Sequence, residues 1–204
     1  NTDDDSGLLS LPAPTNTTSN TAIAPAFSAS NASSRALARG RSRARLLLSA
    51  AASCPCSDWK APVEQVFLEV RAGRTDRARA LVRAAIARFP GTGRLWALRV
   101  ALAQEQGFEE QSRMFQLAVG ETPKSGEVWC EGAKIALNPT FPSFSLKTAA
   151  EFLRFAVHFT PQYGDSFVEL IRVKMLSFGP FQDHESMQRL RSLCINTDPN
   201  YGLQ

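Results

Sequence analysis

The sequence contains only two histidines and four cysteines among its 204 residues. Structural zinc sites take four nitrogen or sulfur ligands, and the Cys-Pro-Cys at residues 54–56 has neither a second cysteine pair nor a nearby histidine to complete such a set. We therefore expect no metal ion and no cofactor. The cysteines also lack the regular spacing of a disulfide framework, which indicates a reducing, intracellular compartment.

The short motifs that usually carry catalysis are missing as well. The chain has no G-x-x-x-x-G-K-[ST] phosphate loop, no G-x-S-x-G nucleophile turn, no H-E-x-x-H zinc helix and no zinc-deaminase signature. His158 lies between Val157 and Phe159, and we interpret it as a structural histidine rather than a catalytic base. No run of about eighteen apolar residues occurs, so nothing predicts a membrane span. The sequence thus predicts a protein that is not an enzyme and has no membrane partner.

Residues 1–57 differ in composition from the remainder of the chain. They begin with Asn rather than Met and are rich in Ser, Thr, Asn, Ala and Pro, with no apolar periodicity over the first part. Such a segment buries too little apolar surface to offset the entropy of ordering it, so we expect it to be disordered. Residues 58–204 form the expected folded domain, and the whole chain is expected to be a piece of a longer protein.

The end of this first segment, residues 34–53, is rich in arginine. Five arginines occur without an acidic residue between them, namely Arg35, Arg39, Arg41, Arg43 and Arg45. This basic patch is consistent with a nuclear address, an RNA or ribonucleoprotein contact, or a stretch of transit-peptide composition, and equally with a solvated linker helix broken at Gly40. Charge is uneven along the chain, because residues 1–99 hold 14 Lys and Arg against 7 acids, and residues 100–204 hold 9 against 12.

A four-residue motif, Pro-x-x-Gly, is repeated along the second part of the chain. It occurs at residues 90–93, 123–126, 161–164 and 199–202, at spacings of 33, 38 and 38 residues. Three residues after the first three glycines come Trp96, Trp129 and Phe167. The apolar residues around each copy fall at helical spacing, and the proline ends the preceding helix. The repeat therefore predicts four helix pairs, in units of about 58–92, 93–125, 126–163 and 164–201. The spacing of the tryptophans is that of core residues, and we expect Trp129→Ala to cost about 3–5 kcal/mol.

This unit resembles the tetratricopeptide repeat (TPR) and its half-a-TPR (HAT) relative. The aromatic residue six positions after the proline, the alanine five positions before the next proline and the proline itself match that family. The family's glycine on the first helix is replaced here by Val100, Ala133 and Ile171. The stretch from Pro123 to Glu131 is most similar to HAT repeats of a scaffold of pre-mRNA splicing.

The resemblance implies an all-α fold, a TPR/HAT-like α-solenoid of antiparallel helix pairs behind a disordered N-terminal segment. It implies a non-catalytic protein–protein interaction scaffold in an RNA-processing assembly, with pre-mRNA splicing as the leading candidate and the nucleus as the suspected compartment. The alternative is a helical-repeat regulatory or targeting module of a larger enzyme or organellar complex.

Members of this family bind protein partners in a groove lined by side chains of the first helix of each pair, which packing does not need. By that resemblance the groove positions are Arg94, Ala97, Ala101 and Gln104, then Glu127, Cys130, Lys134 and Leu137, then Asp165, Val168, Arg172 and Met175. The polar candidates for partner binding are Arg94, Gln104, Glu127, Lys134, Asp165 and Arg172. This mixture suits an extended peptide or another helix, and it lacks the Lys and Asn set that clamps a terminal carboxylate.

Overall fold

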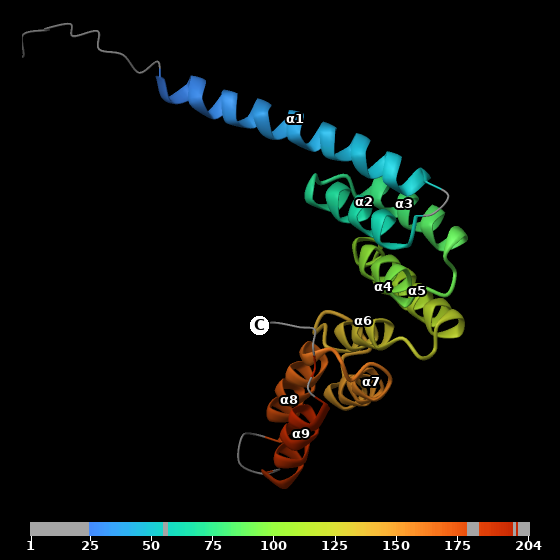
Figure 1. The fold of residues 1–204 in the computed structure, drawn as a ribbon. Helices are drawn as coiled ribbons and strands as arrows, with labels where there is room; N and C mark the ends of the chain where they lie inside the picture. The colour runs from blue at the N-terminus through green and yellow to red at the C-terminus, as the bar shows by residue number, and fades with distance from the viewer. Residues whose placement is uncertain (1–24, 55–56, 179–183, 198, 200–204) are drawn as a thin grey trace, which may run out of the picture. The chain divides into compact units, whose positions relative to one another are not determined.

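The computed structural model describes residues 25–54, 57–178, 184–197 and 199, and within these residues it is helical and has no strand. The helices in chain order are α1 (Pro25–Ser53), α2 (Lys60–Arg71), α3 (Thr75–Arg88), α4 (Gly93–Leu102), η1 (Gln104–Gln106), α5 (Phe108–Glu121), α6 (Gly126–Ala136), α7 (Leu146–Phe159), α8 (Gly164–Phe178) and α9 (His184–Thr197) (Figure 1). The prediction of an all-α fold is confirmed.

The helices from α2 onward form consecutive pairs. Packing joins α2 to α3, α4 to α5, α6 to α7 and α8 to α9, and each pair also contacts the next, with α4 lying against α6. The chain divides into two compact units between Ser42 and Arg43, and all four pairs belong to the second unit. This arrangement confirms the TPR-like α-solenoid that the repeated motif predicted.

Residues 25–53, which belong to the segment predicted to be disordered, form a helix, α1. This helix continues through Gly40, where one of the alternatives, a solvated linker helix, was expected to break. Ala, Leu and Arg, which are strong helix formers, dominate residues 35–52. A single glycine inside a helix costs only about 1 kcal/mol relative to alanine, which these neighbours offset. Residues 1–24 of the predicted disordered segment lie outside the described residues.

The Pro-x-x-Gly turn is tied to the tryptophan that follows it. The indole Nε1 of Trp96 donates a hydrogen bond to the carbonyl oxygen of Pro90 at 2.8 Å, and Trp129 makes the same bond to Pro123 at 2.8 Å. A buried or half-buried indole N–H needs an acceptor, and the turn supplies it. The six-residue spacing from proline to tryptophan therefore allows a hydrogen bond that stabilises the turn.

The glycine of the motif is required by the approach of the next unit. A Cβ atom built on Gly93 would lie 2.0 Å from the Ser125 hydroxyl oxygen. A Cβ atom on Gly126 would lie 1.8 Å from the Thr160 hydroxyl oxygen and 2.8 Å from the Ala156 carbonyl oxygen. Any larger residue would push successive turns apart. Most of the fourth motif, at residues 199–202, lies outside the described residues.

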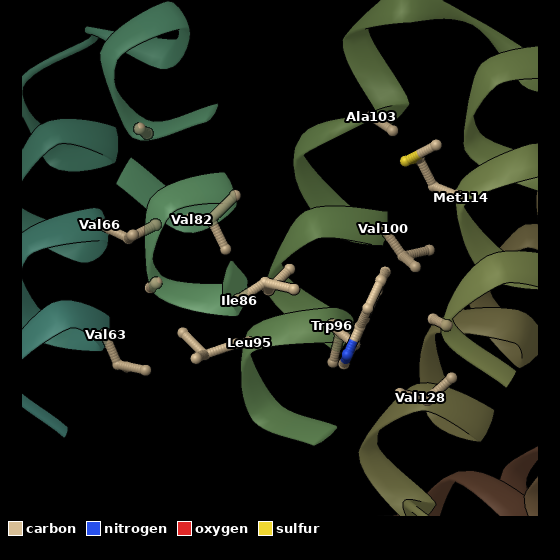
Figure 2. Packing of buried hydrophobic residues seen from close by; sticks show 14 of the residues in the cluster. Val63, Val66, Val82, Ile86, Leu95, Trp96, Val100, Ala103, Met114 and Val128 are labelled. Atoms are coloured by element: carbon tan, nitrogen blue, oxygen red, sulfur yellow. The ribbon is translucent and has the colours of Figure 1, made fainter. Parts of the chain in front are cut away.

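The core is built from two clusters of buried side chains. The first cluster extends through the helices from α2 to α6. Figure 2 shows Ile86 of α3 beside Leu95 of α4, with Trp96 on the side of α4 that is turned toward Val128. The second joins α6, α7 and α8, with Leu153 and Phe167 among its members. Trp96 is 7% exposed, whereas Trp129 is only half-buried. Trp129 packs between neighbouring helices as predicted, against the rings of Phe115, Phe152 and Phe155, but it is less buried than Trp96.

Candidate partner-binding groove

A hollow of about 750 Å³ lies along the first helices of three successive pairs, α4, α6 and α8, and we call it the groove. Its lining includes Arg94, Glu127, Lys134 and Asp165, which are four of the six polar residues that the sequence predicted for partner binding. The structure brings these four together, although up to 71 residues separate them in the chain. Their role in binding a partner stays a prediction.

Each of these helices has one face in the core and one face in the groove. On α4 the core takes Leu95 and Val100, whereas Ala101 lines the groove together with Ala97, a member of the core cluster that stands four residues before it on the same side of the helix. Small side chains therefore form much of the groove floor. Packing fixes the orientation of the core face, and the groove face follows from it because the helix is rigid.

Ion pairs hold the charged side chains of the groove in place. The Arg94 guanidinium of α4 lies 2.8 Å from a carboxylate oxygen of Glu127 on α6, so this pair joins two neighbouring units. Within α6, the Lys134 ammonium lies 2.6 Å from a carboxylate oxygen of Glu131, whose side chain is only 13% exposed. Both cations of the lining are thus bound to carboxylates of the same lining.

Two of the predicted polar residues lie outside the lining. Gln104 belongs to the short helix η1 and is exposed, because α4 ends at Leu102 and the groove face of α4 ends with it. Arg172 lies one turn further along α8, where its guanidinium contacts the Glu169 carboxylate at 2.8 Å. The roles of Gln104 and Arg172 in partner binding stay predictions that the groove lining does not include.

Residue-based reasoning missed several groove residues, namely Leu98, Glu131, Ser166 and Glu169. All four directly follow a predicted position, because Leu98 follows Ala97, Glu131 follows Cys130, Ser166 follows Asp165 and Glu169 follows Val168. The exposed face of a helix spans about 100° or more, which is wider than a single row of residues. A prediction that used the whole face would have included these four.

Cys130 lies in the groove lining beside Ser166. Its Sγ atom is 3.4 Å from the Ser166 hydroxyl oxygen. Burial raises the pKa of the Cys130 thiol above its usual value, against a smaller opposing effect of the Ser166 hydrogen bond. A thiol with a raised pKa stays protonated near neutral pH and is a poor nucleophile. Cys130 therefore fits a packing role in the groove wall.

The five arginines of the basic patch do not share one environment. Arg35 and Arg39 are exposed on α1, Arg41 is partly exposed, and Arg43 is exposed. Arg45 instead forms two hydrogen bonds to Glu69 of α2, at 2.5 Å and 3.1 Å. Glu69 is 2% exposed, and the hydrogen bond from Arg45 holds the pKa of its carboxyl below the usual value. Arg45 therefore stabilises a buried carboxylate and does not extend the exposed basic surface.

Two further findings concern metals and membranes. Within the described ranges, no group of three or more His, Cys, Asp or Glu side chains is placed to hold a metal ion, and Cys56 lies outside these ranges. None of the described helices is both long enough and apolar enough to cross a membrane.

Comparison with known proteins identifies related sequences and folds. The family model for the PRP6 TPR-like domain matches residues 31–204. A TPR-containing protein of Dictyostelium discoideum is 46% identical over 145 residues, which make up 71% of this chain and 11% of that protein. The chain thus spans only about a tenth of this relative's length.

Solved structures show the same helical-repeat fold at low sequence identity. A double mutant of MamA from Desulfovibrio magneticus RS-1 is 15% identical with a TM-score of 0.50, over 82% of this chain and 91% of that chain. A human IFIT1 dimer with m7Gppp-AAAA is 12% identical with a TM-score of 0.50, over 70% of this chain and 34% of that chain. At these identities the likeness concerns the fold alone.

Proposed function

The chain belongs to the PRP6 TPR-like domain family, and from this membership we propose that it is a non-catalytic scaffold that holds protein partners in a nuclear pre-mRNA splicing assembly. Helical repeats of this kind serve as protein-interaction scaffolds, because stacked helix pairs present an extended binding surface. Two observations support the proposed assembly. One is the family membership, and the other is the similarity of residues 123–131 to HAT repeats of a scaffold of pre-mRNA splicing.

The observation that carries the proposal is the groove. It crosses three successive units and combines a floor of small and apolar side chains with ordered charged groups along its walls. Binding sites for partner segments have this composition, in which apolar area provides affinity and a few polar groups provide specificity. A partner segment lying in the groove would contact α4, α6 and α8 at once.

We assign to α1 a second contact, with RNA or ribonucleoprotein. Arg35, Arg39 and Arg43 have exposed side chains, and guanidinium groups bind phosphate oxygens well. Arg45 is excluded from this surface by its pairing with Glu69.

A second candidate function is a regulatory or targeting module of a larger enzyme or organellar complex. The observation that favours it is the small share, 11%, of the Dictyostelium relative that this chain covers. The two candidates differ in which proteins lie next to the groove in the cell.

Crosslinking mass spectrometry on the full-length protein, purified from its own cells, tests the proposal. We expect crosslinks from Lys134, which lies in the groove wall and is exposed, to proteins of the splicing machinery. Nuclease treatment before crosslinking identifies any partner that is held only through RNA.

A matched pair of variants shows whether the groove is responsible. Ala101→Trp places a large ring in the groove, and Ala84→Trp places the same ring on an exposed position of α3 outside it. We expect the crosslinked partners to be lost from the first variant and retained by the second. Crosslinks confined to an enzyme domain of the same chain, or to organellar proteins, would contradict the splicing assignment.

A further inference from the structure

Three arginines gather outside the groove, where α3, α4 and α5 meet. Arg83 belongs to α3, Arg99 to α4 and Arg113 to α5, and none of them lines the groove. A short turn joins the end of α3 to the start of α4, so the two helices run in opposite directions. Accordingly, Arg79 of α3 donates a hydrogen bond to the carbonyl oxygen of Leu102, the last residue of α4, at 3.5 Å. Arg83 stands one turn after Arg79 and Arg99 one turn before Leu102, which places both arginines at the same level.

Arg99 carries its charge in a partly buried position. Its guanidinium lies 5.4 Å from the centre of the Trp96 ring, and its side chain is only partly exposed. Burial lowers the pKa of Arg99, and the positive charges of Arg113 and Arg83 lower it further, against a smaller effect of the Glu110 carboxylate. An arginine remains protonated at neutral pH all the same. The junction of the three helices therefore carries an excess of positive charge.

The carboxylate that acts on Arg99 is already paired with another arginine. Glu110 accepts hydrogen bonds from the Arg113 guanidinium at 2.9 Å and 2.7 Å. Within the part of the chain that the structure describes, neither Arg83 nor Arg99 forms an ion pair with a carboxylate. A cation that is partly removed from water and lacks a counter-charge is unfavourable. A bound anion would supply the missing counter-charge.

Two neighbouring guanidinium groups without carboxylate partners match a phosphate group in charge and in hydrogen bonding. A guanidinium donates two parallel N–H bonds to the oxygens of a phosphate. A phosphorylated serine or threonine carries a charge of about −1.5 to −2 at neutral pH and presents three acceptor oxygens. Arg83 and Arg99 together carry a charge of similar size. The carboxylate of an ordinary acidic side chain would balance only one of the two.

The surroundings favour a single phosphate group over the backbone of RNA. The arginines that would extend a basic track are engaged elsewhere, because Arg79 pairs with Glu105 and Arg88 donates to backbone carbonyl oxygens. Glu105 and Glu109 are exposed beside the junction and repel a chain of phosphates. The Trp96 ring is 7% exposed, so no base can stack on it. A single phosphorylated side chain needs only the two unpaired guanidinium groups.

We propose that Arg83 and Arg99 bind a phosphorylated serine or threonine side chain of a partner protein. The site is separate from the groove, so it adds to the proposed scaffold function and does not depend on it. The repeat does not require arginine at this position, since Gly132 takes the place of Arg99 in the next unit. Phosphorylation of the partner would thus control a contact at this one junction.

Three pools of fluorescein-labelled nonapeptides test the proposal. They share random neutral flanking residues and differ only in the central residue, which is phosphoserine, serine or glutamate. We expect the full chain to bind the phosphoserine pool at least about tenfold more tightly than either other pool in fluorescence anisotropy. The physical reason is that two guanidinium groups bind a dianion more strongly than a single negative charge. A labelled oligouridine, measured in the same way, represents RNA.

Two variants remove the site, and a third serves as the matched control. Arg83→Gln removes an exposed guanidinium without disturbing the core, and Arg99→Met keeps an apolar side chain over the Trp96 ring. Each is expected to weaken binding of the phosphoserine pool about tenfold. Arg154→Gln, on an exposed position of α7 outside the groove, removes the same charge and is expected to retain wild-type binding.

The outcomes decide between a phosphate site, general charge attraction and RNA. Equal binding of the phosphoserine and serine pools would overturn the proposal. Equal losses in Arg83→Gln and Arg154→Gln would also overturn it, because only the net charge of the chain would then matter. Oligouridine binding that falls in Arg83→Gln, with no binding of the phosphoserine pool, would assign the site to RNA instead. None of these outcomes concerns the groove, which the Ala101→Trp variant tests separately.

Discussion

The first half of the repeat domain relies on arginine side chains at places where the second half uses aromatic rings. Around α2 to α4, the Arg79 guanidinium lies 3.2 Å from the Glu105 carboxylate, and the Arg99 guanidinium lies 5.4 Å from the centre of the Trp96 ring. Around α5 to α7, the ring of Trp129 lies 5.9 Å from that of Phe115 and 4.8 Å from that of Phe155. The same repeated frame therefore accepts two different packing chemistries.

Two pairs of equivalent positions in successive repeats show how aromatic and arginine side chains replace one another. Phe115 and Val82 each stand eight residues before a motif proline, and Gly132 and Arg99 each stand three residues after a tryptophan. A Cβ atom on Gly132 would lie 2.3 Å from the ring of Phe115, so the large ring requires the glycine. At the preceding junction between units, the equivalent positions hold the small Val82 and the long Arg99. A large ring opposite a glycine at one junction thus corresponds to a small aliphatic residue and an arginine at the other.

The largest difference between the halves is expected at the two tryptophans. Trp96→Ala removes a 7% exposed side chain and should lower the free energy of unfolding by about 3–5 kcal/mol. Trp129→Ala should cost less, because its ring is half-buried and its neighbours can close over the space. Denaturant unfolding of both variants measures the comparison. Equal losses of unfolding free energy in the two variants would show that the helices around Trp129 pack as tightly as those around Trp96.

Glu69→Gln tests the first half of the repeat domain, where the Glu69 carboxylate is buried and accepts hydrogen bonds from Arg45. The variant should lose about 2 kcal/mol at neutral pH, because it removes charge-assisted hydrogen bonds. The Glu69 pKa is lower in the folded than in the unfolded protein. Its contribution is therefore present above the unfolded pKa of about 4.3, and it is lost as the pH falls through the folded pKa.

Unfolding curves of the wild type and of Glu69→Gln, recorded from neutral to acidic pH, should converge. Glu64→Gln is the control on the same helix, since Glu64 is exposed, and its curve should follow that of the wild type. A constant gap between wild type and Glu69→Gln at all pH values would refute a charge-based role.

Smaller effects are expected when alanine replaces either of two glycines in the neighbouring helices α5 and α6. The two substitutions should change stability in opposite directions. Gly132→Ala should destabilise by about 1–2 kcal/mol, because overpacking against Phe115 outweighs the gain in helix propensity. Gly120→Ala, in α5 with open space around it, should stabilise by about 0.5–1 kcal/mol. Adding Phe115→Leu should relieve the first loss. Additive effects in this double-mutant cycle would mean that the ring does not occupy the space of the missing Cβ.

Much of the groove could be predicted from the sequence, because the repeat places equivalent residues on equivalent helix faces. Arg94, Glu127, Lys134 and Asp165 were found in this way. Gln104 was not placed correctly, because the end of α4 depends on how the chain leaves that helix rather than on the repeat period. Helix ends are settled by local turns and by packing, which a single repeat pattern does not contain.

The sequence by itself determined the helix pairs, since the proline, glycine and tryptophan of the motif act within a few residues of one another. Only the tertiary structure decided which charges pair. Arg94 finds Glu127 in the next unit, and Arg45 finds Glu69 on another helix, 24 residues away. Long charged side chains can reach several partners, and burial depends on neighbours distant in the chain. The charge of the groove and the loss of Arg45 from the basic surface are therefore consequences of packing.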